Sequence, residues 1–308
     1  MKSIVLIFPY FGKLPVQYKM WRESALRNPS VDFMFFTDAD VEPAKNIIVH
    51  KMLFEDFRKY IQSIFDFPIV LDRPYILCDF KPAYGEALQE YINKYDYWGY
   101  GDLDVVYGDI RAFLTDEILC HYKFFLGFGH LTLYSNDKET NTYYKVIVPG
   151  YQDYREAFTI HDQTFFDEYD HKGTADKWKE CRTNDCWLEW PFDNASKPKQ
   201  SYHFNSLTRG WKQVVFEHID NKLYMIRFNK GEKERKESLY AHFQHRPFMK
   251  DRVTNYNHFL ITPRAIIDYP HSLTTLKLRF YCRKQNLMTK YYQWKDRILW
   301  KLGKGYIR

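Results

Sequence analysis

Two aspartates one residue apart, Asp102 and Asp104, follow the aromatic and apolar run 97–101. Side chains at positions i and i+2 of an extended segment point the same way, so both carboxylates can face one small cation from the end of a strand. Paired carboxylates are hard oxygen ligands that suit Mg²⁺ or Mn²⁺, and such ions keep positions open for phosphate oxygens. The alternative is an ordinary turn after a strand, because a bare Asp-x-Asp is common.

The segments before this motif alternate between strand-like and helix-like patterns. We expect strands at 4–8, 31–37 and 47–49, and helices at 16–28, 53–65 and 80–94. This alternation predicts an α/β fold with a mostly parallel sheet and helices on both faces, whose ligands lie beyond the carboxyl ends of the strands. Asp38 and Asp102 both lie at such ends.

The pattern changes after Asp104. Residues 124–134 have strand character with glycine breaks, and 159–169 have the pattern of a helix. Segments 214–217 and 223–228 resemble a hairpin, and the charged segment 230–237 is expected to be an exposed loop. We therefore expect one main domain followed by a C-terminal extension.

Composition favours a protein of the cytoplasm. The five cysteines among the 308 residues show no C-x-x-C spacing, which indicates neither a disulfide framework nor a zinc site. No apolar run approaches the length of a membrane span. Aromatic residues make up 19% of the chain, a content typical of surfaces that stack on sugar-like ligands, although core packing accounts for most of them.

The positive charge is concentrated in the last segment. From Lys277 to the end there are ten Lys and Arg residues and one acid, so this segment carries a net charge of +9. The whole chain carries +6, so the residues before Lys277 sum to about −3. Residues 271–308 therefore read as a basic amphipathic helical extension that suits an anionic membrane surface. A helix packed on the domain is the alternative. No nucleic-acid motif accompanies the charge, so nucleic acid is not expected as a partner.

An α/β half followed by Asp-x-Asp at a strand end resembles the GT-A class of sugar-nucleotide-dependent glycosyltransferases. It is similar to bacterial capsule-synthesis and lipopolysaccharide transferases related to the glycogenin family, over roughly residues 2–250. The resemblance implies a GT-A (Rossmann-like) catalytic domain at 1–270, with a nucleotide-binding half at 1–104 and an acceptor half at 105–270. It implies transfer of a hexose-like sugar from a nucleotide donor, expected to be a UDP-sugar, to a capsule, O-antigen or lipopolysaccharide acceptor.

The same resemblance assigns roles to individual residues. It implies a metal site that takes Mn²⁺ or Mg²⁺ at Asp102, Asp104 and His242. It implies donor contacts from Pro9, Tyr10, Asp38, Asp79, Lys81, Asp102 and Arg246, and catalytic roles for Asp162 and Gln163. The glycine and Lys-Pro-Trp that usually follow the histidine are replaced by Gln244 and Arg246-Pro247-Phe248, which puts the phosphate contacts in doubt.

Other readings of these residues stay open. His242 could be structural, and Asp79 and Lys81 could form a surface ion pair. In an inverting enzyme Asp162 would take the proton of the acceptor hydroxyl. In a retaining enzyme Asp162 or Gln163 would lie beside the anomeric centre. The structural alternative is that Asp162 is an acid favoured by a helix N-terminus.

Two rival functions use the same features. The Asp102 and Asp104 pair could be the nucleophile and acid of a haloacid-dehalogenase-type phosphatase, but that motif continues to a threonine where this chain has Val106. A non-catalytic carbohydrate-binding protein would account for the aromatic residues but not for the α/β half or the clustered acids. We therefore expect a metal-dependent glycosyltransferase, cytoplasmic or peripheral at the inner face of the cell membrane.

Overall fold

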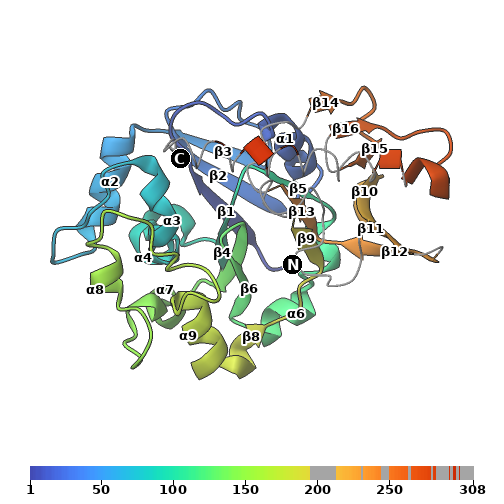
Figure 1. The fold of residues 1–308 in the computed structure, drawn as a ribbon. Helices are drawn as coiled ribbons and strands as arrows, with labels where there is room; N and C mark the ends of the chain where they lie inside the picture. The colour runs from blue at the N-terminus through green and yellow to red at the C-terminus, as the bar shows by residue number, and fades with distance from the viewer. Residues whose placement is uncertain are drawn as a thin grey trace. The chain divides into compact units, whose positions relative to one another are not determined.

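The computed structural model describes residues 1–194, 213–229, 232–243, 250–262 and 265–278, together with 280, 281, 291, 294, 295 and 298. The chain divides into two compact units (Figure 1). The first unit comprises Met1–Leu14, Asn28–Asp102 and Leu114–Trp190, and the second comprises Pro15–Arg27, Leu103–Phe113 and Pro191–Arg308. One break falls between residues 102 and 103, close to the division expected after residue 104, but the chain passes between the units at four further points.

The first unit is built on a seven-stranded sheet. Its strands lie in the order β3 (Ile47–Lys51), β2 (Val31–Thr37), β1 (Ile4–Pro9), β4 (Tyr97–Gly101), β7 (Leu131–Ser135), β6 (Phe124–Phe128) and β8 (Cys186–Trp187). The first four strands are parallel, β7 is antiparallel to both of its neighbours, and β8 is parallel to β6. The prediction of a mixed α/β fold with a mostly parallel sheet is confirmed.

Short helices cover this sheet. They are α2 (Phe54–Ser63), α3 (Leu77–Phe80), α4 (Tyr84–Ala87), α5 (Gln89–Ile92), α6 (Asp116–His121), α7 (Lys138–Asn141), α8 (Tyr154–Ala157) and α9 (Thr174–Cys181). Four 3₁₀ turns, η1 (Pro74–Ile76), η2 (Lys81–Ala83), η4 (Tyr143–Lys145) and η5 (Thr183–Asp185), join them. Figure 1 shows α2, α3, α4 and α9 on one side of the strands.

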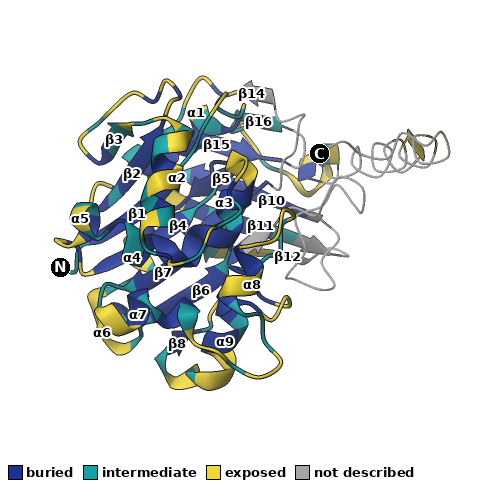
Figure 2. Ribbon diagram, turned by 90° about the vertical axis from the view of Figure 1, so that its left-hand side faces the viewer, coloured by how far each residue is buried: buried dark blue, intermediate teal, exposed yellow. Residues whose placement is uncertain are grey.

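Alternate residues of the strands build the core under these helices. Val5 and Ile7 of β1 pack with Trp98 and Tyr100 of β4, and helix residues such as Phe57 close the same cluster. Figure 2 shows the central strands buried and the outer surfaces of α6 and α9 exposed. Because both faces of a mostly parallel sheet are covered, its strands read as nearly continuous apolar runs.

The expected helix at 80–94 is broken into η2, α4 and α5. Pro82 lies in η2, where its missing N–H costs no hydrogen bond. A side chain on Gly85 would collide with the ring of Trp98, which is fully buried. The glycine therefore lets α4 approach the sheet closely, at the cost of helix continuity.

The prediction of a helix at 159–169 is wrong. These residues are turns and irregular backbone, and Phe165 has a φ of 58°, in the left-handed region. The carboxylate of Asp79 accepts hydrogen bonds from the backbone N–H groups of Thr164 (2.8 Å) and Phe166 (3.0 Å). These tertiary bonds satisfy donors that a helix would otherwise use, so they override the local pattern.

The second unit contains α1 (Tyr18–Leu26), the 3₁₀ turn η3 (Ile110–Ala112) and two further sheets. The three-stranded sheet has the order β5 (Val105–Tyr107), β13 (Tyr240–His242) and β9 (Phe192–Asn194). The six-stranded sheet has the order β12 (Glu232–Ser238), β11 (Lys222–Asn229), β10 (Gln213–Ile219), β15 (His258–Ile261), β16 (Ala265–Asp268) and β14 (Lys250–Arg252).

The hairpin expected in this region is confirmed. β10 and β11 pair antiparallel around Asp220 and Asn221, whose φ angles of 47° and 72° fit a type I′ turn. The expectation of a loop at 230–237 is wrong over the part that the structure describes, because 232–238 form β12 at the edge of the sheet. Its alternating charged side chains suit an edge strand, since they oppose pairing with another chain.

The extension begins by packing on the six-stranded sheet. Leu278 is almost fully buried against Val215, Ile226 and Leu260, with Tyr281 alongside. This packing concerns Leu278 and Tyr281, which precede the basic segment that starts at Arg283. Most of the basic tail lies outside the described residues; within it, Tyr291, Trp294 and Ile298 are helical and exposed. No described helix is long and apolar enough to cross a membrane.

Buried tyrosines predict a loss of stability at alkaline pH. Burial raises the pKa of Tyr97 and of Tyr143 to about 12, whereas an unfolded tyrosine titrates near about 10. Above pH 10 the unfolded chain loses these protons first, so the free energy of unfolding falls as the pH rises towards 12. Urea unfolding at pH 9 and pH 11.5 measures this loss. Tyr143→Phe should lose less stability between the two pH values than the wild type, and an equal loss would contradict the assignment.

Candidate metal site

Residues expected to bind the donor follow adjacent parallel strands of the first unit. Pro9 is the last residue of β1, and the N–H of Tyr10 continues the ladder to the carbonyl of Phe36 at 3.0 Å. Asp38 follows β2, and its carboxylate accepts a 2.7 Å hydrogen bond from the N–H of Gly12. Pro9, Tyr10 and Asp38 therefore lie at the carboxyl edge of the sheet, as the strand pattern predicts.

Asp102 follows the next strand along this edge. β4 pairs in parallel with β1, and the N–H of Asp102 donates to the carbonyl of His130 at 3.3 Å. This bond extends the pairing with β7 by one residue and fixes the backbone of Asp102. The side chain is 37% exposed, so its carboxylate is accessible to a ligand.

Asp104 and His242 are held together by the small sheet of the second unit. β5 starts directly after Asp104, and Val105 lies opposite His242 of β13. The N–H of Phe243 donates to the backbone carbonyl of Asp104 at 2.9 Å. The His242 Nε2 and Asp104 Oδ1 atoms are 3.3 Å apart, and both side chains are less than a tenth exposed. The backbone ladder therefore places an imidazole beside a carboxylate.

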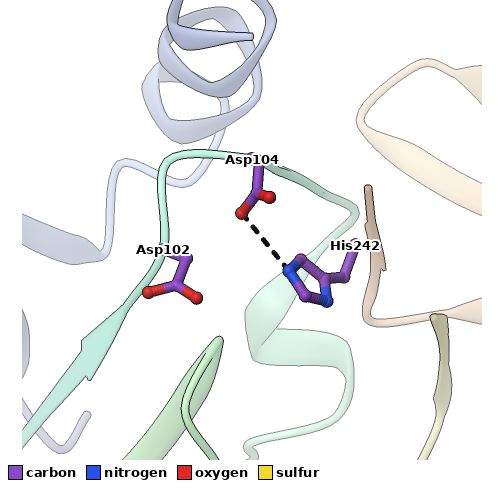
Figure 3. A group of neighbouring side chains, drawn as sticks. All are labelled: Asp102, Asp104 and His242. Carbon is purple, nitrogen blue, oxygen red and sulfur yellow. Dashed lines mark ion pairs between the residues drawn. The ribbon is translucent and has the colours of Figure 1, made fainter. Parts of the chain in front are cut away.

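Asp102, Asp104 and His242 form a group that could hold a metal ion (Figure 3). Each offers one ligand atom, and these atoms lie within 4.8 Å of one another. Ligands at about 2.1 Å from one octahedral ion are about 3 Å apart at right angles and about 4.2 Å apart across the ion. The 4.8 Å limit is slightly wider than this spacing, so small side-chain rotations would bring the three ligand atoms onto one cation.

Asp79 and Lys81 do not form a surface ion pair. Both are buried, with 0% and 7% of their surfaces exposed. The Lys81 ammonium donates to the carbonyl of Gly129 at 2.7 Å and to Asp102 Oδ1 at 3.0 Å. Asp79 instead binds the backbone of Thr164 and Phe166. The expectation of a surface ion pair is wrong because the two side chains bind different partners, although they are only two residues apart in a tight helical segment.

Burial raises the pKa of the Asp79 carboxyl, and the hydrogen bonds from Thr164 and Phe166 oppose that shift. Asp79 thus serves as a clamp on the segment 162–167. Through this clamp the segment that carries Lys81 also fixes the backbone next to Asp162 and Gln163.

Asp162 and Gln163 lie outside the metal-ligating group. The Asp162 side chain is 95% exposed and has Arg73 as an ion partner at 3.9 Å. The helix that would have made Asp162 an N-terminal acid is absent from this described segment. Gln163 is half-buried. The catalytic roles of both remain predictions, and Arg246 lies outside the described residues.

One buried acid was not expected from the sequence. Asp167 is 1% exposed, and Lys81 lies 3.8 Å from its carboxylate. The segment Phe166-Asp167-Glu168 carries no spacing signal, because it sits in a stretch that reads as a helix. The four cysteines that the structure describes are free, which agrees with the absence of a predicted disulfide framework.

Comparison of the whole sequence with known families gives one assignment. Residues 6–270 match a family of unknown function, DUF6625. The chain belongs to this family. The match includes the group Asp102, Asp104 and His242 and the first-unit sheet apart from Ile4 and Val5 of β1. No curated protein matches the sequence.

We expect the DUF6625 chain to bind one Mn²⁺ ion through Asp102, Asp104 and His242. Asp104→Asn and His242→Ala should each weaken Mn²⁺ binding by at least about tenfold, because each removes a ligand. The amount of free Mn²⁺ in a titration, read by electron paramagnetic resonance, measures this affinity.

His258→Ala is the matched control. It breaks another histidine–carboxylate contact of the second unit, His258 Nε2 to Glu217 Oε1 at 2.9 Å, and should leave Mn²⁺ affinity unchanged. Equal affinities for wild type and His242→Ala would show that His242 is structural.

The Asp79 clamp predicts a local effect. Asp79→Asn keeps the size of the side chain but leaves one acceptor oxygen for two backbone donors, so it should cost about 1–3 kcal/mol of stability. Hydrogen exchange should accelerate at the amides of Thr164 and Phe166. Asp72→Asn, which changes an exposed carboxylate that contacts His161 at 3.1 Å, serves as the control. Unchanged protection in Asp79→Asn would rule out the clamp.

Proposed function

We propose that this protein is a metal-dependent glycosyltransferase of the GT-A type that uses a nucleotide-sugar donor. The observation that carries the proposal is the grouping of Asp102, Asp104 and His242, with ligand atoms within 4.8 Å of one another. The parallel strands of the first unit support it, because Pro9 ends β1, and Tyr10, Asp38 and Asp102 directly follow the adjacent strands β1, β2 and β4. Ligands of open parallel sheets bind at such edges.

The chemistry of transfer explains why a cation belongs there. Cleavage of the bond between the anomeric carbon and phosphate leaves a nucleoside diphosphate that gains negative charge. A bound divalent cation supplies Lewis-acid stabilisation of that charge. In this proposal Asp102, Asp104 and His242 hold the cation, and Pro9, Tyr10 and Asp38 contact the nucleoside. Arg246 would add a charge-assisted hydrogen bond to the phosphates.

The acceptor hydroxyl must lose a proton during transfer. Asp162 would accept it in an inverting reaction, since an exposed carboxylate remains available to a hydroxyl. In a retaining reaction Asp162 or Gln163 would lie beside the anomeric centre, and the leaving phosphate would take the proton. The Asp79 clamp supports either role, because it fixes the backbone that carries both residues.

We propose a capsule, O-antigen or lipopolysaccharide glycan as acceptor and a UDP-sugar as donor. With a lipid-linked acceptor, the basic tail after Arg283 would hold the protein at the inner face of the cell membrane. The exposed Tyr291, Trp294 and Ile298 suit that role, since exposed aromatic and aliphatic side chains among cations favour a membrane surface.

The direct test is a donor screen that records nucleoside diphosphate release with and without Mn²⁺. We expect release from a nucleotide sugar only with the metal. Asp102→Asn or Asp104→Asn should lower the rate by at least about a hundredfold without unfolding the protein. His258→Ala should keep full activity.

The rival functions give different outcomes. Inorganic phosphate released from small phosphoesters would favour a phosphatase, and sugar binding without turnover would favour a carbohydrate-binding protein. Full activity in Asp102→Asn or Asp104→Asn would overturn the proposed function.

A further inference from the structure

The Lys81 ammonium lies behind Asp102 in the first unit. It donates to Asp102 Oδ1 at 3.0 Å and to the carbonyl of Gly129 at 2.7 Å, and it lies 5.3 Å from the centre of the Tyr100 ring. Its side chain is 9% exposed, compared with 37% for that of Asp102. A ligand therefore reaches Asp102 first, and Lys81 contacts the same carboxylate from the protein side.

Asp167 is the second acidic neighbour of Lys81. Its side chain is 1% exposed, and neither carboxylate oxygen has a hydrogen-bond partner among the described residues. The Lys81 Nζ atom lies 3.8 Å from Asp167 Oδ2. A buried carboxylate without hydrogen bonds is costly, so its retention calls for an explanation.

The Lys81 ammonium therefore has two acidic neighbours, Asp102 and Asp167, and one carbonyl partner, that of Gly129.

We propose that Lys81 is a positioning residue for the metal ligand Asp102, and that Asp167 holds Lys81 in place. The hydrogen bond to Oδ1 fixes the rotation of the Asp102 carboxylate, so that Asp102 would offer its Oδ2 atom to a bound cation. The carbonyl of Gly129 sets the direction of the ammonium, and Asp167 draws it back towards the protein. This inference rests on the proposed metal site and does not depend on which substrate the protein uses.

Electrostatics alone predicts the opposite effect, which makes the proposal testable. A positive charge next to a cation site repels the cation, so its removal should strengthen metal binding if repulsion were all that mattered. If Lys81 orients Asp102, removal of the ammonium should weaken binding in spite of the lost repulsion. The sign of the change distinguishes the two.

The experiment measures Mn²⁺ affinity and thermal unfolding of the full chain, without an activity assay. Lys81→Met should weaken Mn²⁺ binding about tenfold or more, the range seen when groups that orient metal ligands are removed. It should also lower the melting temperature, because Asp167 is left as an unpaired buried carboxylate. Lys145→Met is the matched control: this lysine pairs with Glu86 at 2.6 Å in the same unit, and its loss should not change Mn²⁺ affinity.

Two further variants separate orientation from stability. Lys81→Met/Asp167→Asn removes both buried charges, so it should regain stability relative to Lys81→Met but bind Mn²⁺ just as weakly. Asp167→Asn removes the group that holds the Lys81 ammonium in place, so Asp102 is oriented less firmly and Mn²⁺ affinity should fall a few-fold.

Each outcome decides between the alternatives. Mn²⁺ binding to Lys81→Met that equals or exceeds the wild type overturns the positioning role and leaves the proposed function standing. Unchanged affinity in Asp167→Asn overturns the role of Asp167. If Lys81→Met does not fold, Mn²⁺ binding to the double variant provides the same test. If neither variant folds, Lys81 is needed for folding, and its assignment as a positioning residue is overturned. A wild-type chain that does not bind Mn²⁺ overturns the metal site and the proposed function together.

Discussion

Parallel pairing of β1 with β2 and β4 is the constraint on which the first unit depends. The register sets Ile7 opposite Met34 on one side and Tyr100 on the other. Since parallel strands end at the same edge, the residues that follow them are brought together without any long-range contact of their own. Polar side chains collect there because the carboxyl edge is where the buried strands meet solvent.

Buried charge is the second constraint, and the segment 79–81 shows how it is met. Asp79 and Lys81 are two residues apart, and each is taken out of water. Asp79 accepts hydrogen bonds from backbone N–H groups of a loop, and Lys81 donates to a carbonyl and a carboxylate. Charges that are costly to bury remain in a structure when their partners need to be fixed. Here the partners are the loop that carries Gln163 and the strand end that carries Asp102.

Local patterns predicted the elements whose contacts are local or repetitive. The strands β1, β2 and β3 and the helix α2 follow from apolar periodicity. Asp102 and Asp104 are found from their place after a strand, but they lie in the irregular turn between β4 and β5 and not in an extended segment. The loop at 159–169 could not be predicted, because its conformation depends on Asp79, which lies far away in the sequence. For the same reason the burial of Lys81 and Asp167 has no sequence signal. His242 came from a family resemblance, since nothing local marks the residue that lies opposite Val105.

The three metal-ligating residues are fixed in two different ways. The side chains of Asp104 and His242 come from backbone held in the ladder between β5 and β13, and both are almost fully buried. The Asp102 side chain is the exposed member, and its place depends on the hydrogen bond from Lys81. A side chain on backbone held by a ladder is displaced when that backbone moves, whereas a carboxylate held by one ammonium can rotate as soon as that hydrogen bond is lost. Asp102 is therefore the member whose orientation other side chains can adjust, and Lys81 and Asp167 are the groups placed to adjust it.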